Sequence, residues 1–375
     1  MKTYKIAVIP GDGIGPEVIG ETIKTLEKSG ENFGFSFEWK NFPYGAGHYL
    51  ATGEVMPEEA MKEMSKCDAM LLGAIGDPRV KPGILEQGIL LAFRFRFDQY
   101  VNLRPAISLP KVHTPVDLKG AKMDSVVVRE NTEDLYMCIG GTTETGELEL
   151  PVDLSRGKYE LKGTLKLKMD PGYPFAAQAA INSRPGVERI TRYACDLAKK
   201  RGEDTVTVVS KSNAVSALYG FFEDVAKKVM NDEYPELKYA MVNVDALCYH
   251  LVRNPAAYGV LLCPNLFGDI ISDLQAGLAG GLGTAAGGNI GDGLSMFEPV
   301  HGSAPDIAGT GRSNPVAAIL SGALMLEHLG EPEASKAINC AVSDFLENAA
   351  DNRLPFEFGG AATFEQVGEN IRKYI

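Results

Sequence analysis

Apolar residues follow two patterns along this chain. Short apolar runs bounded by turn residues predict strands that are buried on both faces, and stretches with apolar residues at every third or fourth position predict helices. Because the two kinds of segment alternate, the pattern predicts an α/β fold. The predicted strands are residues 5–10, 69–74, 125–128, 206–209, 239–244 and 260–263, and the clearest predicted helices are residues 186–200, 217–230 and 314–329.

The segment 265–273, NLFGDIISD, predicts a helix with two carboxylates on one face. Asp269 and Asp273 are four residues apart, about 6 Å along a helix axis, so one bound ion can contact both. The alternative is two acidic residues on a solvated helix face. The neighbouring side of the helix is expected to be buried through Phe267, Ile270, Ile271 and Leu274.

The charges around this helix favour a bound cation. Between Arg253 and Arg312 the chain has five acidic residues but no Lys or Arg. A partly buried carboxylate pair there needs a distant basic side chain or a cation to balance its charge. Carboxylate ligands without Cys or His favour Mg²⁺ or Mn²⁺ over zinc.

Three of the predicted strands are followed by a polar residue that could carry chemistry. Arg129 follows the strand at 125–128, and Lys211 and Asp245 follow two later strands. In open α/β sheets, ligands bind beyond the carboxyl ends of the strands. We therefore expect a ligand site at that edge of the sheet.

Arginine is concentrated in the segment 90–105, which contains Arg94, Arg96 and Arg104. Arginine pairs with carboxylates through two hydrogen bonds, so three converging guanidinium groups, with Arg129 included, would suit a substrate with two carboxylates. Arg94 and Arg96 alternate with phenylalanines, so at least one of them is expected to be an ordinary surface residue.

Two glycine-containing loops are candidates for nucleotide binding. The loop at 11–17, GDGIGPE, is similar to the dinucleotide fingerprint, but Pro16 stands where its third glycine would be, which argues against a conventional Rossmann site. The loop at 298–314, EPVHGSAPDIAGTGRSN, is long and has few bulky side chains. Its amides are expected to wrap a nucleotide, with His301 beside the adenine. An ordinary surface loop is the alternative in both places.

The segment 141–184 has a different pattern, in which leucines alternate with charged residues before a Pro- and Gly-containing stretch. This pattern predicts an extended hairpin arm. We expect the arm to make subunit contacts rather than to take part in catalysis.

The composition narrows the class of protein. A chain of 375 residues is long enough for two lobes around a large core. The net charge of -12 argues against a nucleic-acid or anionic-membrane partner, although not against an anionic substrate. Six scattered cysteines without a C-x-x-C motif indicate reduced thiols and a cytoplasmic location. We expect no signal peptide and no membrane span.

Five ordered motifs carry a family resemblance: GDGIGPE, NLRPA, VVVRENTED, NLFGDIISD and FEPVHGSAPDIAGTGRSNPVAAILS. Together they resemble the metal-dependent β-decarboxylating dehydrogenases that act on isopropylmalate, isocitrate, homoisocitrate and tartrate or D-malate. The resemblance covers residues 5 to about 330. It implies the two-lobed fold of that family instead of a Rossmann domain. Residues 1–99 and 280–375 would form the cofactor lobe, and residues 100–279, with the arm, would form the substrate, metal and dimerisation lobe.

The resemblance also implies roles for individual residues. Tyr136 and Lys211 match the catalytic pair, whereas Arg96 matches no functional residue. The partner subunit would supply Lys211 and Asp245, which makes the active form a homodimer with shared sites. Arg94, Arg104 and Arg129 match the arginines that bind the substrate carboxylates, and Asp245, Asp269 and Asp273 match the metal ligands, with Asp245 also near the substrate. The matching cofactor loop contains Glu298, His301, Gly302, Ser303, Ala304, Pro305, Asp306, Ile307 and Asn314.

The implied reaction is an oxidation followed by decarboxylation. Hydride would pass from C2 of a 2-hydroxy dicarboxylate to NAD⁺. Lys211, alone or together with Asp245 or a water, would accept the hydroxyl proton, and Tyr136 would protonate C3. Asp306 and Ile307 stand where relatives that use NADP carry Lys and Tyr, and a carboxylate near the ribose would repel a 2′-phosphate, so we expect NAD.

The substrate is expected to be 3-isopropylmalate, as in leucine biosynthesis. Leu90 and Leu91 would present methyl groups to its isopropyl group, although both could instead belong to the core. FDQYVNLRP at 97–105 is closer to the tartrate and D-malate branch, which is the second choice, ahead of isocitrate and homoisocitrate. A non-catalytic regulatory subunit is disfavoured because the catalytic pair and the three aspartates are all present. Gln87 replaces the Glu, Arg or Trp of relatives, so the substrate lid is expected to differ.

Overall fold

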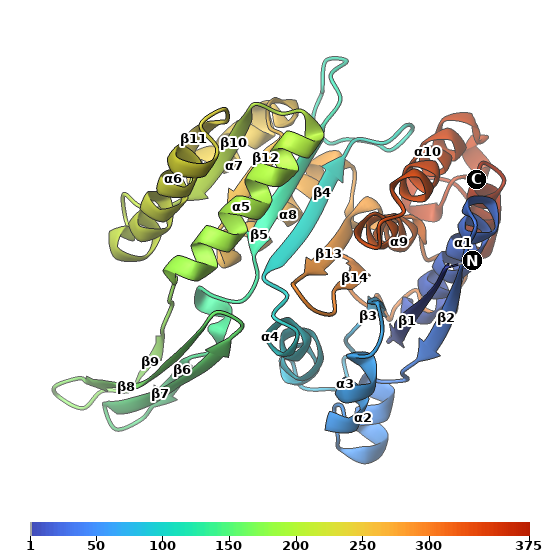
Figure 1. The fold of residues 1–375 in the computed structure, drawn as a ribbon. Coiled ribbons are helices and arrows are strands. Elements are labelled where there is room, and N and C mark those ends of the chain that lie inside the picture. Colours follow the sequence, from blue (N-terminus) through green and yellow to red (C-terminus); the bar gives the residue numbers. More distant parts are fainter. Residues whose placement is uncertain (1) are drawn as a thin grey trace.

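The computed structural model describes residues 2–375, which form a ten-stranded sheet and two small two-stranded sheets. The large sheet has the strand order β11-β10-β12-β5-β4-β13-β14-β3-β1-β2 (Figure 1). Most neighbours are parallel, and antiparallel pairing is confined to the central strands β5, β4, β13 and β14. The strands are β1 (Lys2–Gly11), β2 (Phe35–Asn41), β3 (Ala69–Ala74), β4 (Val101–Ile107), β5 (Asp124–Glu130), β10 (Thr205–Ser210), β11 (Lys238–Asn243), β12 (Val260–Cys263), β13 (Ala286–Ile290) and β14 (Met296–Pro299).

Helices cover both faces of this sheet. Side chains alternate along a strand, so Val126 and Val128 on β5 pack into one core while Val127 packs into another on the opposite face. The helices on the same face as Val126 and Val128 are α1 (Gly15–Phe33), α5 (Arg184–Arg201), α6 (Phe221–Glu233), α9 (Val316–His328), α10 (Pro332–Asn348) and α11 (Phe364–Arg372). The opposite face carries α2 (Ala46–Thr52), α3 (Glu58–Met64), α4 (Ala92–Arg96), α7 (Val244–Arg253) and α8 (Asn265–Ala279).

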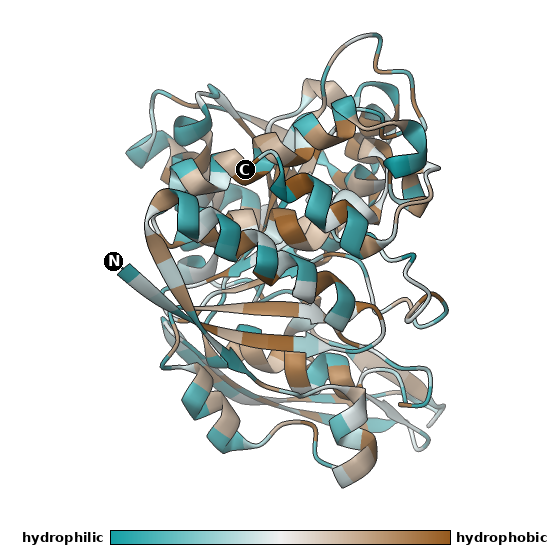
Figure 2. Cartoon of the chain, turned by 90° about the vertical axis from the view of Figure 1, so that its right-hand side faces the viewer, coloured by the Kyte–Doolittle hydropathy of each residue, from teal (hydrophilic) through white to brown (hydrophobic). Residues whose placement is uncertain are grey.

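Burial on both faces explains the apolar runs. Every residue of β3 is buried, as is typical of a parallel strand covered by helices on both sides. Figure 2 shows the hydrophobic colour along the strands and on the inner sides of the helices, and polar colour on their outer sides. The predicted α/β fold is confirmed.

Local sequence signals set the ends of the helices. At the start of α5, the Ser183 side chain accepts a hydrogen bond from the Gly186 amide over 3.1 Å, and Pro185 occupies the first turn, where its missing N–H costs nothing. The helix ends at Arg201 and is capped by Gly202, whose φ of 73° lies in the left-handed region that favours glycine.

The arm at 141–184 is confirmed as an extended hairpin that projects from the body of the molecule (Figure 1). Leu161, Leu165 and Leu167 on its outer strand are 37%, 42% and 42% exposed. Its role in subunit contact stays a prediction. The arm consists of β7 (Glu147–Arg156) paired with β8 (Tyr159–Lys168), and of β6 (Gly140–Thr143) paired with β9 (Phe175–Gln178).

Some predicted details were wrong. Residues 217–220 belong to a π-helical turn, Ser216–Gly220, that precedes α6. Val244, predicted as strand, begins α7, and the helix predicted from residue 314 begins at Val316. Ile270 is 52% exposed instead of buried. No helix within residues 2–375 combines the length and the hydrophobicity that crossing a membrane requires.

Candidate active site

The two carboxylates of α8 converge on one positive centre. Asp269 and Asp273 lie on successive turns, and Oδ1 of each is 3.3 Å from Nη1 of Arg104. Because both carboxylates face this single atom, the pair is a candidate for holding one hard cation. The basic side chain that balances this acidic helix therefore comes from β4, far away in the sequence.

Arg129 completes this charge cluster from β5. Its Nη1 donates to Asp269 Oδ1 over 2.5 Å, and its Nε donates to the backbone oxygen of Asn265 over 2.9 Å. Its Nη2 is buried and has no hydrogen-bond partner among residues 2–375. A buried donor without a partner is costly, so Nη2 is a candidate contact for an anionic ligand.

Arg94 approaches the same space from α4. It is 6% exposed, and its Nε is also buried without a partner in the described part of the chain. Burial lowers the pKa of Arg94, and burial together with the charges of Arg104 and Arg94 lowers that of Arg129. Three guanidinium groups are thus crowded together, and a ligand with two carboxylates would relieve their repulsion.

Tyr136 lies against this cluster. Its hydroxyl donates to Asp269 Oδ2 over 2.5 Å, and the Arg129 guanidinium lies 4.8 Å from the centre of its ring. Burial and the hydrogen bond to Asp269 raise the pKa of Tyr136. The phenol therefore keeps its proton at neutral pH and is available as a proton donor.

Burial alone would raise the pKa of Asp269, but the charge of Arg129, the Tyr136 hydroxyl and Arg104 lower it below its ordinary value. For Asp273 burial dominates, and its pKa is raised despite Arg104. A bound divalent cation would stabilise both carboxylates in the charged form.

A pocket of about 140 Å³ joins several predicted substrate and cofactor residues. Arg94, Arg104 and Leu90 line one part of it, and His301 and Gly302 line another. Ile89 is fully buried in the core, and Leu91 does not line this pocket. Glu298, also in the lining, accepts a hydrogen bond from Asn289 over 2.7 Å.

An adjoining pocket of about 300 Å³ is formed around the loop at 298–314. His301 lines both pockets, and Ala304, Ile307 and Asn314 line only the second. Burial lowers the pKa of His301, so its ring is neutral at physiological pH and suited to contact a flat heterocycle. Pro305 and Asp306 are exposed beside it, whereas Ser303 is buried.

The glycine loop at 11–17 packs against the 298–314 loop. The Ile14 amide donates to the Ser303 backbone oxygen over 2.8 Å, and Ile14 lines the second pocket. A Cβ atom at Gly13 would lie 1.9 Å from that oxygen, and its φ of 57° is in the left-handed region, so only glycine fits. The loop is thus part of the candidate nucleotide site without being a Rossmann turn.

Lys211 and Asp245 form a separate pair. Lys211 Nζ lies 2.6 Å from Asp245 Oδ1, and this hydrogen bond lowers the pKa of the carboxyl. No cluster of three Asp, Glu, His or Cys side chains suited to a metal occurs within residues 2–375. One chain therefore brings together Asp269 and Asp273, but not Asp245.

A model of the isocitrate/isopropylmalate dehydrogenase family matches residues 5–371 of this chain. The chain belongs to that family. It is 42% identical over 378 residues to the 3-isopropylmalate dehydrogenase of Thermobifida fusca, with 100% of this chain and 98% of that protein covered. It is 43% identical over 374 residues to the 3-isopropylmalate dehydrogenase of Bifidobacterium longum, with 99% of this chain and 98% of that protein covered. The crystal structure of isocitrate dehydrogenase from Methylococcus capsulatus is 33% identical and matches with a TM-score of 0.83 over 99% of both chains.

The family resemblance of the motifs is thus confirmed, and so is the family fold. Arg96, which matched no functional residue of the family, pairs at the surface with Glu58 over 2.6 Å. Arg312, near the expected adenosine loop, stacks over Phe356 at 4.9 Å.

Several residues of the candidate site do not stand out in the sequence. Asn102 and Ser272 accept hydrogen bonds from Arg104 over 2.7 and 2.8 Å and so orient it. Phe356 and Glu357 from the C-terminal region line the second pocket, and Glu357 accepts a hydrogen bond from Asn314 over 2.9 Å. Asn102 lies inside the NLRPA motif and could have been singled out, but nothing in the tail sequence connects it with the loop.

Proposed function

We propose that this chain catalyses the NAD-dependent oxidative decarboxylation of (2R,3S)-3-isopropylmalate to 4-methyl-2-oxopentanoate and CO₂, a step of leucine biosynthesis. The observation that carries the proposal is the convergence of Arg94, Arg104 and Arg129 beside the paired carboxylates of α8. Relatives named 3-isopropylmalate dehydrogenase that align over almost the whole chain support it.

The arginines suit a dicarboxylate. Arg94 Nε and Arg129 Nη2 are buried donors without partners among residues 2–375, and two carboxylates can supply the missing acceptors. Leu90 adds an apolar wall to the same pocket, which favours a branched alkyl group at C3 over a third carboxylate. Each buried methylene contributes about 0.8 kcal/mol to such a preference.

The chain contains residues suited to hold the cofactor and the metal. The loop from Glu298 to Asn314 would hold NAD, with Asp306 near the ribose, and Asp269 and Asp273 would hold Mg²⁺ or Mn²⁺ together with Asp245. When bound, the dinucleotide supplies a hydride acceptor and the cation supplies a Lewis acid for the hydroxy acid.

The side chains of the protein move the protons. Lys211, in its neutral amine form, accepts the proton of the substrate hydroxyl as C2 is oxidised, and the phenol of Tyr136 delivers its proton to C3 after CO₂ has left. Arg94, Arg104 and Arg129 keep the substrate oriented through both steps. Leu90 lines the pocket, and with substrate bound its side chain would limit the access of water to C3.

The active form is a homodimer in which the partner subunit supplies Lys211 and Asp245. Three observations support this. The Lys211–Asp245 pair lies apart from Asp269 and Asp273 within one chain. The helices that carry Asp245 and Asp269 expose apolar side chains, with Val252 49% and Ile270 52% exposed. The arm also exposes a row of leucines.

We infer a cytoplasmic location from the cysteines, all six of which are free thiols. We infer no nucleic-acid or membrane partner from the net charge of -12.

The test is NADH formation by the full chain with Mg²⁺ or Mn²⁺ across 3-isopropylmalate, D-malate, tartrate, isocitrate and homoisocitrate. We expect 3-isopropylmalate to lead in kcat/KM by about a hundredfold, as pocket contacts of this kind allow. If D-malate or tartrate leads, the substrate assignment is wrong, although the reaction class stands. If no substrate reduces NAD⁺, the reaction class itself is wrong.

A further inference from the structure

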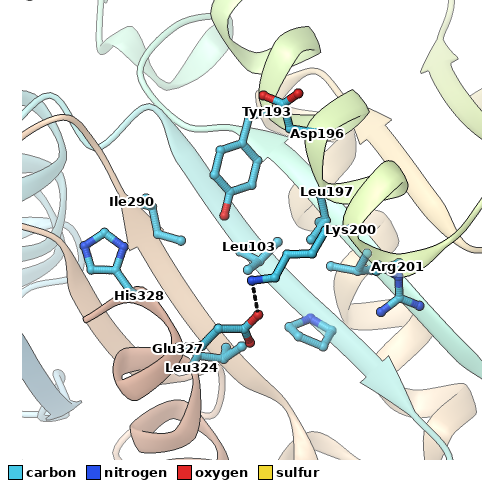
Figure 3. A pocket seen from close by; sticks show the side chains of 12 residues that line it. Leu103, Tyr193, Asp196, Leu197, Lys200, Arg201, Ile290, Leu324, Glu327 and His328 are labelled. Carbon is cyan, nitrogen blue, oxygen red and sulfur yellow. Dashed lines mark hydrogen bonds and ion pairs between the residues drawn. The ribbon is translucent and has the colours of Figure 1, made fainter. Parts of the chain in front are cut away.

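Figure 3 shows a cavity of about 500 Å³. It lies on the opposite face of the sheet from the candidate active site. The alternation of β4 separates the two: Leu103 faces the cavity, while its neighbours Asn102 and Arg104 face the site. The volume falls within the range of small-molecule sites. None of the residues assigned to substrate, metal or cofactor lines it.

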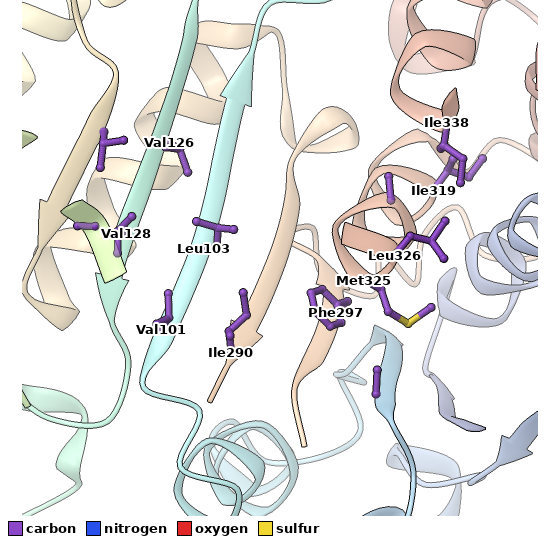
Figure 4. Close-up of a cluster of buried hydrophobic side chains, with 14 of the residues drawn as sticks. Val101, Leu103, Val126, Val128, Ile290, Phe297, Ile319, Met325, Leu326 and Ile338 are labelled. Carbon is purple, nitrogen blue, oxygen red and sulfur yellow. The ribbon is translucent and has the colours of Figure 1, made fainter. Parts of the chain in front are cut away.

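The floor of the cavity is apolar. Leu103, Val126 and Ile290 project into it from three neighbouring strands, and Leu197 and Leu324 close it from α5 and α9. Figure 4 shows how Leu103, Val126 and Ile290 lie side by side on this face of the sheet. Such a floor would take an alkyl or aryl group.

One ion pair bridges the cavity between the two helices. Lys200 Nζ on α5 lies 2.5 Å from Glu327 Oε1 on α9, as the dashed line in Figure 3 marks. Lys200 is 61% exposed and Glu327 37% exposed. Exposed pairs of this kind contribute little to stability, so the two groups can separate to bind a ligand.

The other charged groups of the lining have partners of their own. Arg201 pairs with Glu203 and Asp124 over 2.6 and 2.9 Å. Asp196 accepts a hydrogen bond from Tyr234 over 2.9 Å. Lys200 and Glu327 are therefore the charged groups that bridge the cavity itself.

Two neutral polar groups add to the lining. Tyr193 reaches into the cavity with its hydroxyl (Figure 3), and burial raises its pKa, so it remains a hydrogen-bond donor. His328 packs against Phe297 with ring centres 5.5 Å apart, and burial lowers its pKa, so it is neutral at physiological pH.

We propose that this cavity binds an apolar amino acid in its zwitterionic form. The α-carboxylate takes the place of Glu327 beside Lys200, the α-ammonium pairs with Glu327, and the apolar side chain lies on the floor of Leu103, Val126 and Ile290. A ligand with only a carboxylate would leave Glu327 without its cation, and an amine would leave Lys200 without its anion. A zwitterion satisfies both.

Isothermal titration calorimetry on the full-length protein, with no substrate present, tests this binding. The probes are L-leucine and L-phenylalanine. They are compared with 4-methylpentanoate, which lacks the ammonium group, with 3-methylbutylamine, which lacks the carboxylate, and with glycine, which lacks the apolar side chain. We expect saturable binding of at least one of the two apolar amino acids, with each incomplete analogue weaker by about tenfold or more. No saturation by either amino acid up to about 50 mM, or equal affinity for 4-methylpentanoate, would overturn the proposal.

Three variants test whether the amino acid binds in this cavity. Lys200→Met and Glu327→Gln should each weaken it by about tenfold, since each removes one charged partner. Lys199→Met is the matched control, because Lys199 is the next residue on α5 and pairs with Glu236 outside the cavity over 2.7 Å. Affinity that stays unchanged in Lys200→Met and in Glu327→Gln means that the amino acid binds elsewhere, which also overturns the proposal. Because the measurement detects binding and not turnover, it is independent of the proposed reaction.

Discussion

The hydroxyl of Tyr136 donates a hydrogen bond to Asp269 Oδ2 over 2.5 Å. A side chain with the chemistry of a proton donor thus touches a side chain with the chemistry of a metal ligand. The other oxygen of Asp269 contacts Arg129 over 2.5 Å, so one carboxylate links the candidate acid with one of the three candidate substrate-binding arginines. This arrangement allows Tyr136 to act close to where a metal-bound substrate would lie.

Tyr136→Phe is therefore expected to lower kcat by about a hundredfold or more, with a much smaller change in KM, because general acid catalysis contributes about 10²–10⁴ in rate. Steady-state NADH formation measures both values. The melting temperature should remain close to that of the wild type. A kcat within about threefold of the wild type would show that another group protonates C3.

Removal of divalent cations should abolish turnover. We expect EDTA-treated protein to regain activity on addition of Mg²⁺ or Mn²⁺, and Asp273→Asn to raise the metal concentration for half-maximal activity by about tenfold or more, because it removes one charged ligand. Asp292→Asn is the control: Asp292 is 68% exposed and pairs with Lys158. Equal metal dependence in the two variants would contradict the assignment of Asp273.

Shared sites can be tested by subunit mixing. Tyr136→Phe and Lys211→Met homodimers should each have little activity. If Lys211 acts in the partner's site, each mixed dimer contains one intact site and one doubly altered site. Random exchange should then restore about a quarter of the wild-type activity. Mixtures that stay inactive, although exchange is verified by mass, would place Lys211 and Tyr136 in the same subunit's site.

Cofactor preference should depend on residues 306 and 307. The double variant Asp306→Lys with Ile307→Tyr removes a carboxylate that would repel a 2′-phosphate and adds a cation that would attract it. We expect the ratio of kcat/KM for NADP to that for NAD to rise by about a hundredfold, since the change replaces repulsion by attraction. If the wild-type protein already favours NADP, the NAD assignment is wrong.

Glu130 should make stability depend on pH. Burial, followed by the charge of Glu133, raises the pKa of Glu130 from 4.5 to about 7 in the folded protein. Between these pH values the carboxyl of Glu130 holds a proton in the folded state and has released it in the unfolded state. Its contribution to the free energy of unfolding is therefore fully present below pH 4.5 and is lost as the pH rises through 7. The direction of the change follows from the raised pKa of the folded state.

Urea unfolding at several pH values between 5 and 8 measures this effect. Glu130→Gln should flatten the decline over that interval, while Glu149→Gln, whose carboxylate is 64% exposed on the arm, should leave it unchanged. A wild-type stability that rises steadily from pH 5 to 8, with no difference in Glu130→Gln, would contradict the prediction.

Much of the fold follows from the sequence because burial leaves a local pattern. The strand predicted at 69–74 coincides with β3, and that at 260–263 with β12. The helix at 265–273, with two carboxylates on one face, was also predicted correctly. The burial of individual side chains was predicted less well. Ile270 has the right spacing for the apolar stripe but is 52% exposed, since spacing does not show which parts of a helix another element covers.

Side-chain chemistry also allowed Asp269, Asp273 and the arginines to be named from the sequence. Tyr136 was named from the family resemblance of the motifs. The same sequence showed that the charge of α8 must be balanced from elsewhere, because no Lys or Arg lies near it in the chain.

Only the tertiary structure decided which residues meet. Arg104 reaches Asp273 across 169 positions, and Asn314 reaches Glu357 from the C-terminal region. It also decided that Leu103 and Arg104, adjacent in sequence, face different cavities on the two sides of the sheet. The physical reason is that residue type and periodicity are local properties, whereas strand order and helix packing bring distant residues together and set what each side of a strand faces.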